Sequence, residues 1–526
     1  MNRYKQANEG IHAPEELKKK AARPPQDRPY VRWTQAVAAV LAVAVLGGIA
    51  MWPGRSTGPS ADNPVGPAPF SIGGDSRMVE GPTAQATALA VASYPEMHPY
   101  PREENFYSGK NVDWEKASRA FNKAYDAWWE DRDALRSGTD YTGLMDQFLS
   151  RSTAQFLTGA GEDNRVYSPL NVYMALSMLA ETAGGESRRQ ILDLLQADSI
   201  ETLRARATAL WRDHYRDDGM VTSILGSSLW LRDGMTYSQE VLDTLAKDYY
   251  ASSFSGKMGT EEYNQALRDW INEQTRGLLA EQAQGLEMKP ETVLALASTI
   301  YFKAAWHDEF NQENTETDRF HAITGDVDAE FMRRTMDSTF YWGDNFTAVQ
   351  LHFQQGGSMW LLLPAEGYSV DQLLQTGEAM EFLLSPKSDQ HDDSGNVVRE
   401  GWTGQKFLTI HLSMPRFDVS SDLSLIDGLK ALGVTDVFDP DLSNFDPLEA
   451  STDDPLYVSQ AQHAARVKVD EEGCEAAAYT VMMEVTECLI PPDDEVDFTL
   501  DRPFLFAVTG ESGLPLFTGV VNQPNG

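Results

Sequence analysis

The sequence predicts a mixed α+β fold in which the sheets are mainly antiparallel. Helical periodicity dominates the chain from about residue 112 to residue 185, whereas short strand-like runs dominate farther along. The clearest of these runs are LASTIYFKAAW, SMWLLLP, FLTIHLSMPRF, RVKVD, FLFAVTG and LFTGVVNQP. Hairpin-scale turns separate them more often than regular helical crossovers do, which favours antiparallel sheets over a doubly wound α/β fold.

The bulk composition narrows the class of protein. The 526 residues are 42% hydrophobic and include 22 Phe, 19 Tyr and 12 Trp, enough for a substantial core. The formal net charge of −36 argues against nucleic acid as a partner, because nucleic-acid binding requires a basic surface. With only two cysteines, the fold must be held by its core and not by a disulfide framework.

The amino-terminal residues differ from the rest in charge. Residues 1–32 carry 8 Lys/Arg against 4 Asp/Glu, and residues 33–52, WTQAVAAVLAVAVLGGIAMW, carry none. Twenty apolar residues span a bilayer core, and Trp at both ends suits the interfacial belt. We therefore expect a cytoplasmic basic tail (1–32), a single-pass transmembrane signal anchor (33–52) in the cell membrane, and an extracytoplasmic remainder.

Two other interpretations of residues 33–52 stay open. A cleaved signal peptide would leave a secreted protein, but it needs a shorter apolar part and a small-x-small cleavage site directly afterwards. A buried core helix is the second alternative. An anchor followed by a spacer suggests a bacterial cell envelope, which is context and not chemistry.

Residues 53–105 are predicted to form a Pro/Gly-rich stalk. Residues 53–102 contain 15 Pro and Gly. As a random coil, the ends of this stretch would lie roughly 40 Å apart, so it would lift the following part off the membrane.

Three helices are predicted next. Aromatic and alanine residues recur at helical spacing from Trp114 to Trp128, which predicts an amphipathic helix at about 112–136 in an extra N-terminal helical segment, 106–141. We interpret its aromatic stripe as core contact and not as a binding surface. A second helix is expected near Leu144–Leu157, and a third in SPLNVYMALSMLAETAGG, ending at its two glycines. The spacing places the apolar side chains of the third helix on one face: Val172, Ala175, Leu176, Leu179 and Ala183.

The sequence lacks the motifs of known catalytic centres. It contains no HExxH, P-loop, GxSxG or Cys-x-x-Cys motif. A membrane-anchored hydrolase, or a cysteine protease using Cys474 or Cys488, is therefore disfavoured. We expect no enzymatic activity, no cofactor and no metal site. Residues Pro386–Gly401 are polar and lack periodicity, which indicates a surface loop.

Both cysteines lie in one segment, Val469–Val508, that has no settled structural period. Within it, GCEAAA (Gly473–Ala478) holds five small residues in six, which would let a strand enter between two others at little steric cost. As a strand, one face would carry Cys474, Ala476, Ala478, Thr480 and Met482, and the other Glu475, Ala477, Tyr479, Val481 and Met483. From these residues alone, an ordinary surface loop followed by a hairpin is an equal alternative.

Ordered motifs over about Leu144–Pro524 resemble the serpin family. FTLDRPFLFAV and LPLFTGVVNQP resemble its carboxy-terminal motif, and LYVSQAQHAARVKVDEEGCEAAAYT resembles the strand and hinge that precede its reactive-centre loop. NRVYSPLNVYMALSMLAETAGGESRRQI is similar to its buried amino-terminal helix, STIYFKAAWHDEF to its central strand, and DLSLIDGLKALGVTDVFDPDLSNF to a further family block. The resemblance places a serpin domain at 142–526.

This resemblance implies both fold and function. The expected fold has three mainly antiparallel sheets, eight or nine helices and an exposed reactive-centre loop at about 471–495. The expected function is suicide inhibition of serine proteases, with cysteine proteases as a second class. The target cleaves the loop and forms an acyl-enzyme, and the loop then inserts into the main sheet as an extra strand. A non-inhibitory serpin, acting as a surface binding or carrier protein, is the alternative.

The inserting hinge is assigned by resemblance to a run of nine residues. They are Glu472, Gly473, Cys474, Glu475, Ala476, Ala477, Ala478, Tyr479 and Thr480. Two of them depart from the family pattern, because Cys474 stands where Thr is usual and Tyr479 where Ala is common. Cys474 is small, and the alternation places Tyr479 on the outer face, so neither should block entry.

The family spacing of seventeen residues, counted from Glu471, places the scissile bond at Glu487–Cys488. A glutamate before the cleaved bond suits a protease with a basic specificity pocket. The bonds Thr486–Glu487 and Cys488–Leu489 stay open as alternatives. So does the interpretation that Glu487 only keeps the loop soluble.

Five further residues are assigned to the breach and shutter, where the main sheet opens: Trp306, Ser168, Asn171, Ser298 and His463. The family tends to have Ser at position 171 and Asn at position 298, so the amide and the hydroxyl have exchanged places here. The exchange would preserve one donor–acceptor contact. We predict that Ser168, Asn171, Ser298 and His463 form one buried polar cluster.

The spacing of the cysteines argues against a disulfide in an extended loop. Cys474 and Cys488 would then lie roughly 46 Å apart, far beyond the ~7 Å limit for bridging. A bond formed on oxidation would fold the loop back and stop insertion, so a redox switch stays a hypothesis. The expected partners are a target protease and, through the anchor, the membrane, and we expect a monomer.

Overall fold

A computed structural model describes residues 86–108, 112–387, 390–391, 397–398, 402–448, 456–474 and 494–525. These belong to one compact unit that spans Gly74–Gly526. The predicted tail, the anchor and most of the stalk lie outside the described residues, as do Glu475 and the rest of the predicted loop through residue 493. Among the described residues, no helix combines the length and apolar composition that crossing a bilayer requires.

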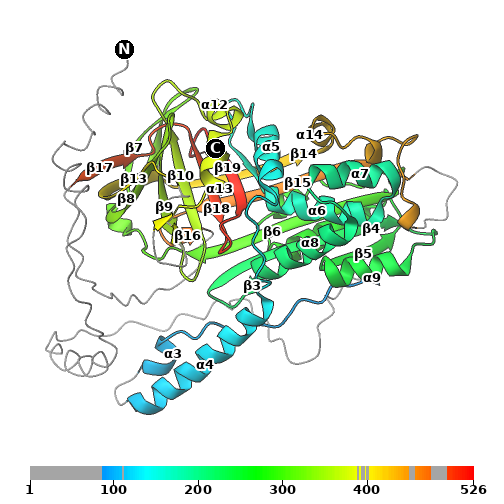
Figure 1. The fold of residues 1–526 in the computed structure, drawn as a ribbon, viewed down its shortest axis with the longest axis horizontal. Coiled ribbons are helices and arrows are strands. Elements are labelled where there is room, and N and C mark those ends of the chain that lie inside the picture. The colour runs from blue at the N-terminus through cyan, green and yellow to red at the C-terminus, as the bar shows by residue number, and fades with distance from the viewer. Residues whose placement is uncertain are drawn as a thin grey trace, which may run out of the picture. The chain divides into compact units, whose positions relative to one another are not determined.

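Twelve α-helices lie in the described part of the chain, more than the eight or nine that the resemblance implied (Figure 1). Two of them precede residue 142, and α11 is a single turn of four residues. The helices are α3 (Glu104–Tyr107), α4 (Trp114–Leu135), α5 (Asp146–Leu157), α6 (Pro169–Thr182), α7 (Gly185–Leu194), α8 (Ile200–His214), α9 (Gln239–Asp248), α10 (Glu261–Gln274), α11 (Ala280–Ala283), α12 (Val370–Gln375), α13 (Glu378–Leu384) and α14 (Ile426–Ala431).

The three predicted amino-terminal helices are present. The helix expected at about 112–136 is α4, which begins after Asp113, whose side chain accepts a hydrogen bond from the Lys116 amide at 3.1 Å. In α6, Ser168 caps the first turn and Pro169 opens it. The sequence indicated a single apolar face for α6, but the helix is buried almost all round because it lies within the core.

The first large sheet has eight strands in the order β1-β5-β4-β6-β16-β15-β14, with β3 paired to β4. The strands are β1 (Thr87–Ala90), β3 (Arg216–Asp217), β4 (Val221–Arg232), β5 (Ala251–Gly256), β6 (Leu294–Ala305), β14 (Phe417–Ser424), β15 (Val458–Val469) and β16 (Gly473–Cys474). The pairs β4–β5 and β6–β15 are parallel, and the others are antiparallel.

The second large sheet has nine strands in the order β17-β13-β8-β9-β10-β18-β19-β2, with β7 paired to β8. The strands are β2 (Arg165–Tyr167), β7 (Glu316–Ala322), β8 (Gly325–Trp342), β9 (Phe346–His352), β10 (Ser358–Pro364), β13 (Gln405–Pro415), β17 (Glu495–Thr499), β18 (Phe504–Thr509) and β19 (Pro515–Val521). The 18-residue β8 pairs with β7, β13 and β9 and so joins these strands into one sheet.

Short elements complete the described part. A two-stranded ladder, β11 (Gln390–His391) with β12 (Val397–Val398), lies within the stretch predicted to be a surface loop. Three 3-10 turns are η2 (Gln312–Asn314), η3 (Asp436–Phe438) and η4 (Asp446–Leu448). The described residues therefore contain two large sheets and one small ladder, in place of the three sheets that the resemblance implied.

The first sheet is covered on both faces. Alternate side chains of β4 divide between two apolar clusters: Leu229 and Leu231 join the main core around α6, whereas Trp230 joins a smaller cluster beneath α10 and α11. On β6, Ala304 belongs to the main core and Ala295 to the smaller cluster. A strand entering beside β6 would therefore present one face to each cluster.

Candidate functional site

A tight turn joins β15 to β16. The carboxylate of Asp470 accepts hydrogen bonds from the amides of Glu472 at 3.1 Å and Gly473 at 3.3 Å, and the Asp470 amide donates to the Gly473 carbonyl at 3.1 Å. An Asp that bonds to amides two and three residues ahead stabilises such a reversal. The chain therefore turns back at the end of β15 and runs antiparallel to it.

The two residues after this turn lie inside the first sheet. Gly473 is opposite Ala305 of β6, and Cys474 is opposite both Ala304 of β6 and Val469 of β15. The Cys474 side chain is 2% exposed. A Cβ atom on Gly473 would approach the Ala304 carbonyl oxygen to 2.3 Å, so this position accepts only glycine without rearrangement.

Trp306, the predicted breach residue, donates two hydrogen bonds to the turn that joins β15 to β16. Its indole nitrogen donates to the Asp470 carbonyl and its amide to the Glu472 carbonyl, both at 2.9 Å. The ring is buried and stacks on Phe353, with centroids 4.9 Å apart and planes 11° apart. One side chain thus connects β6, the hinge turn and the start of the β9–β10 connection.

Glu471 is a buried charge in the same turn that the sequence did not single out. Its carboxylate accepts two hydrogen bonds from Arg416 Nε, at 2.9 and 2.8 Å, and one from the Thr315 hydroxyl. Burial alone would raise the pKa of Glu471, but these hydrogen bonds outweigh it and hold the pKa below its ordinary value. Arg416 and Thr315 are far apart in sequence, so no local pattern predicts the contact.

Beyond Cys474, no strand among the described residues lies between β6 and β15. They pair directly only at Val458–Leu294 and Ala461–Leu296 within the described residues. Residues 297–303 and 462–468, all of which the structure describes, separate this closed end from β16. We call Gly473–Cys474 the hinge end, Val458–Leu294 with Ala461–Leu296 the closed end, and the stretch between them the gap.

The structure brings together the four residues predicted to form a polar cluster. The Ser168 hydroxyl accepts from the Asn171 amide at 3.2 Å, and the Ser168 amide donates to His463 Nε2 at 3.0 Å. The Ser298 hydroxyl donates to the side-chain oxygen of Asn171. Ser168, Asn171 and His463 are buried.

We call these four residues the shutter cluster. Two of its polar groups, the His463 imidazole and the Asn171 side-chain nitrogen, bear on insertion. Burial lowers the pKa of His463 to about 4, so its imidazole is neutral near pH 7. The side-chain nitrogen of Asn171 is buried and has no hydrogen-bond partner among the described residues. A buried donor without a partner costs free energy, so an acceptor that enters the gap here would be favoured.

The other face of the gap carries an apolar pocket. It lies between β6, β15, the helix α10 and the residues that flank α11, and its lining includes Leu267, Ile271, Leu279, Met288, Thr299 and Ala464.

The other predicted site residues lie outside the described residues. These are the hinge from Glu475 to Thr480 and the predicted scissile pair Glu487 and Cys488. In the part of the chain that the structure covers, no group of three or more His, Cys, Asp or Glu side chains is arranged to hold a metal ion.

Three comparisons with known proteins agree with this arrangement. A model of the family described as serpin (serine protease inhibitor) matches residues 145–524. The chain is 30% identical over 404 residues to the putative serpin-Z6C of Oryza sativa subsp. japonica, which covers 72% of this chain and 94% of the relative.

Two crystal structures share the fold. Native tengpin, a thermophilic serpin, superimposes with a TM-score of 0.62 at 24% identity, over 72% of this chain and 93% of tengpin. Thyroxine-binding globulin in complex with thyroxine gives a TM-score of 0.58 at 20% identity, over 72% of this chain and 99% of that one. The comparisons do not support the bacterial, membrane-anchored character expected from residues 1–52, because the relatives found are plant and mammalian.

Proposed function

The chain belongs to the serpin family, and we propose that it is a suicide inhibitor of serine proteases, with cysteine proteases as a second class, and not an enzyme itself. It would trap its target by inserting the cleaved loop, from Glu475 toward Glu487, between β6 and β15. The observation that carries the proposal is the position of β16, which already occupies the hinge end of the gap.

Continuing the register of β16 gives a partner for each hinge residue. Cys474 pairs with Ala304 of β6 and with Val469 of β15, and both pairings are antiparallel. Each residue after Cys474 would therefore pair one residue earlier on both β6 and β15. On this register Glu475 falls between Lys303 and Lys468. Opposite charges directly across a sheet stabilise it by about 0.2–1 kcal/mol per pair. The only charged residue of the hinge beyond Cys474 would therefore meet a cation on each side.

The same register accommodates the alanines. Ala476 would lie between Phe302 and Val467, and Ala478 between Ile300 and Ala465. Cys474 shares a face with Ala304 and Val469 in the main core, so residues 476 and 478 would face that core as well. Methyl groups are small enough to enter between β6 and β15, whose side chains on this face already pack in the main core.

The departure at Tyr479 also fits. On the register it lies between Thr299 and Ala464, both of which line the apolar pocket beneath α10 and α11. Its ring would enter that pocket with the hydroxyl toward the edge, as an amphipathic side chain does. We therefore propose that Tyr479 strengthens insertion in this chain, and does not merely tolerate it.

Thr480 would reach the shutter cluster. Its register partners are Ser298 and His463. The Thr480 hydroxyl can accept a hydrogen bond from the side-chain nitrogen of Asn171, which has no partner among the described residues. Insertion would then satisfy this buried donor. Insertion past Val481 would require the closed end to separate, because Met482 takes the place opposite Leu296 and Ala461.

The proposed reaction uses the protease's own chemistry. The protease nucleophile attacks the carbonyl carbon of Glu487, and its proton passes through the protease's general base to the departing amino group of Cys488. The Glu487–Cys488 amide bond breaks, and the acyl-enzyme that forms is an ester with a serine protease or a thioester with a cysteine protease. Insertion would then carry the acyl group away from the approach point before water can complete hydrolysis. A glutamate at this position directs the inhibitor toward proteases with a basic specificity pocket.

A covalent complex tests the proposal. Incubating the protein with a panel of serine and cysteine proteases should yield an adduct that survives boiling in detergent, and mass spectrometry should place the cut at Glu487–Cys488 or one residue to either side. If every protease that cuts the loop leaves only free cleaved protein, the chain is a non-inhibitory serpin, the binding or carrier alternative. Thyroxine-binding globulin shows that ligand binding occurs on this fold.

The membrane attachment belongs to the proposal as well. We propose that residues 33–52 anchor the protein in a cell membrane with the serpin domain outside the cytoplasm, or that cleavage after them secretes it. A monomer is proposed. Fractionation of full-length protein against a variant lacking residues 1–52 tests the attachment, and a soluble full-length protein would overturn it.

A further inference from the structure

The helix α4 is attached to the first sheet through its last two turns. Figure 1 shows α3 and α4 beside β3 and projecting from it. Trp128 is buried, and its indole nitrogen donates to the Asp218 carboxylate at 2.8 Å. The segment before α3 adds a bond from the Tyr100 amide to the Asp218 carbonyl at 2.8 Å. Asp218, directly after β3, therefore accepts hydrogen bonds both from α4 and from the segment before α3.

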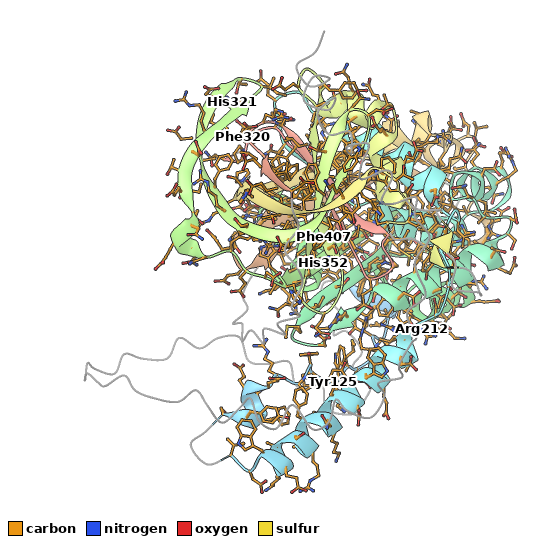
Figure 2. The ribbon with its side chains drawn as sticks, turned by 60° about the vertical axis from the view of Figure 1, so that its left-hand side comes forward. Tyr125, Arg212, Phe320, His321, His352 and Phe407 are labelled. Atoms are coloured by element: carbon orange, nitrogen blue, oxygen red, sulfur yellow. The ribbon has the colours of Figure 1, made fainter. Side chains whose placement is uncertain are left out.

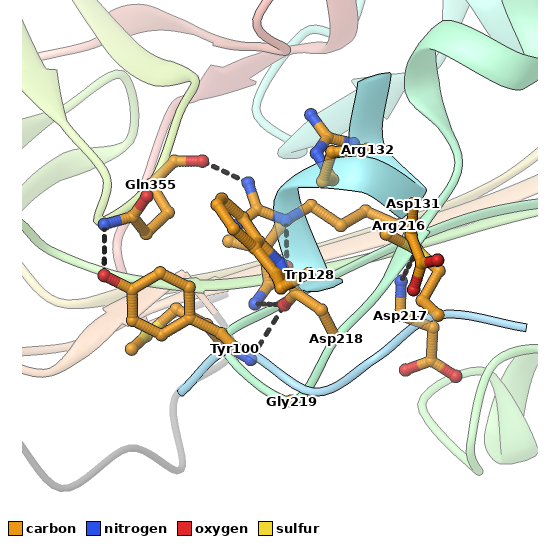
Figure 3. A network of polar contacts seen from close by, with 12 residues as sticks. Tyr100, Trp128, Asp131, Arg132, Arg216, Asp217, Asp218, Gly219 and Gln355 are labelled. Carbon is orange, nitrogen blue, oxygen red and sulfur yellow. Dashed lines mark hydrogen bonds and ion pairs between the residues drawn. The ribbon is translucent and has the colours of Figure 1, made fainter. Parts of the chain in front are cut away.

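Three arginines converge on Glu511 next to this attachment. Figure 3 shows one of them, Arg216, against Trp128 and Asp218. Arg132 Nη2 lies 2.7 Å from one carboxylate oxygen of Glu511, Arg136 Nη2 lies 3.3 Å from the other, and Arg216 Nη1 lies 3.2 Å from the first. Arg132 and Arg216 are each 4% exposed. We call Arg132, Arg136, Arg216 and Glu511 the Glu511 cluster. It joins α4 to the start of the first sheet and to the β18–β19 connection.

The Glu511 cluster also holds the β9–β10 connection. Arg216 Nη1 donates to the Gln355 carbonyl, and the Gln355 side chain donates to the Tyr100 hydroxyl at 2.9 Å. Gln355 has a φ of 59°, an unfavourable value for a residue with a side chain. A Cβ atom on Gly356 would come within 2.5 Å of Glu511 Cγ, so the turn is pressed directly against the cluster. An outside contact must maintain such a turn.

The β9–β10 connection in turn contacts the hinge end. The amide of Gln354, the residue before Gln355, donates to the Ala305 carbonyl at 2.9 Å. Ala305 is the residue opposite Gly473 in the sheet. Phe353, one residue earlier, stacks on Trp306, which binds the hinge turn. Each link in this series is a direct contact between packed groups.

We propose that α4 is a control element for the reactive-loop hinge, acting through the Glu511 cluster and the β9–β10 connection. With the cluster intact, Gln354 and Phe353 hold Ala305 and Trp306 where Gly473–Cys474 can pair with them. When α4 is pulled away or its ion pairs are lost, the connection relaxes and the hinge leaves the sheet. The inference concerns the position of the hinge and stands whether or not the loop traps a protease.

The outer part of α4 is available for such displacement. Trp114 is 63% exposed, and Tyr125, which is 36% exposed, lies on the projecting part of the helix (Figure 2). The ion pair Glu115–Arg119 on this part is exposed, with side chains 80% and 70% accessible. The helix is thus fixed at one end and open to contact at the other.

The thiol of Cys474 reports the hinge position directly. In a Cys488→Ser background, alkylation of full-length protein measures how often Cys474 leaves the sheet. Glu511→Gln keeps the shape of the side chain but weakens all three ion pairs, and it should raise the labelling rate at least fivefold. Glu115→Gln, the matched control on the exposed pair of the same helix, should leave the rate unchanged. Gly473→Ala, whose added methyl group crowds the Ala304 carbonyl and favours departure from the sheet, supplies a reference for fast labelling.

A fourth variant separates coupling from general loss of stability. Met380→Ala, in the buried face of α13 and away from the hinge, should lower the melting temperature without raising the labelling rate. The proposal is overturned if Glu511→Gln labels at the parental rate while α4 becomes sensitive to proteolysis. It is also overturned if Met380→Ala speeds labelling as much as Glu511→Gln does.

Discussion

The two ends of the gap between β6 and β15 are held by different forces. At the hinge end, polar groups hold the chain: the Asp470 turn, the Glu471–Arg416 ion pair and the Trp306 indole bond. At the closed end, the two strands pair with each other at Ala461–Leu296 and Val458–Leu294. The hinge end is therefore already occupied by the inserting chain, whereas the closed end must separate before the last residues can enter.

The difference gives insertion a direction. A strand can begin only where its first residues are already in register, and β16 provides that register at the hinge end. Each further residue adds ladder hydrogen bonds, worth about 1 kcal/mol each in net terms. A charge buried in the core face of the gap should therefore have the largest effect on insertion, and a charge at its surface the smallest.

The largest effect is expected from a charge placed in the core face of the gap. Ala478→Arg would bring a guanidinium between Ile300 and Ala465, where burying an unpaired charge costs more than the about 1–3 kcal/mol of a neutral polar group. Since 1.4 kcal/mol is a factor of ten, the covalent fraction should fall at least tenfold and cleaved inhibitor should accumulate. Gel quantification against Ala478→Ser, which stays small, measures this. Equal complex yields would mean that residue 478 does not insert.

The shutter cluster should make the native fold sensitive to acid. The folded-state pKa of His463, about 4, lies below the ordinary 6.5, so the unfolded chain binds more protons between these values. The stabilising contribution is complete above pH 6.5 and is lost as the pH falls toward 4. The lowered pKa corresponds to about 3 kcal/mol.

Chemical unfolding at pH 7 and pH 4 tests this effect. His463→Asn should lose less stability than the parent chain over this range, by about 3 kcal/mol. The comparison must be between the two proteins, because burial also lowers the pKa of His214 and that residue adds to the acid sensitivity of both. Identical pH profiles for the two would show that His463 is not the group involved.

Gly473→Ala should act only at the hinge end. Its Cβ would meet the Ala304 carbonyl oxygen and the Ala305 Cα, which are backbone atoms that cannot turn aside. Overpacking of this kind costs about 1–3 kcal/mol, which the hinge can avoid by leaving the sheet. The intact variant should melt at a lower temperature than the intact parent chain. The cleaved, fully inserted variant should also melt below the cleaved parent, because residue 473 is still paired with Ala305 in that form. A loss confined to one of the two forms would contradict this account.

The sequence predicted what is local and missed what is distant. The periodicity from Trp114 to Trp128 located α4, and the alternation after Gly473 placed Cys474 on the core face, where it lies. The contact of Arg132 with Glu511 joins residues 379 positions apart, in a chain rich in charge, so no spacing could indicate it. The ion pair of Glu471 with Arg416 was missed for the same reason.

The pairing of β8, the burial of α6 and the register of β16 also depend on tertiary structure. The length of β8 is evident only from its pairing with β7, β13 and β9, which joins all four strands into one sheet. The burial of α6 on all sides likewise comes from its neighbours, since its own sequence suggested one apolar face. The register of β16 was beyond sequence reasoning, because a two-residue strand has no pattern of its own.

The smallest effect is expected where charge lies at the surface of the gap. On the β16 register, Glu475 falls between Lys303 and Lys468, and Glu475→Lys would turn two favourable pairs into repulsive ones. At partly exposed positions this should cost no more than about 1 kcal/mol, or about fivefold in the rate of complex formation, and the effect should shrink in 0.5 M salt. Combining Glu475→Lys with Lys303→Glu should restore most of the rate, because one opposite-charge pair returns. If the double variant is as slow as the single one, residue 475 does not lie beside residue 303, and the register on which the insertion proposal rests must be shifted.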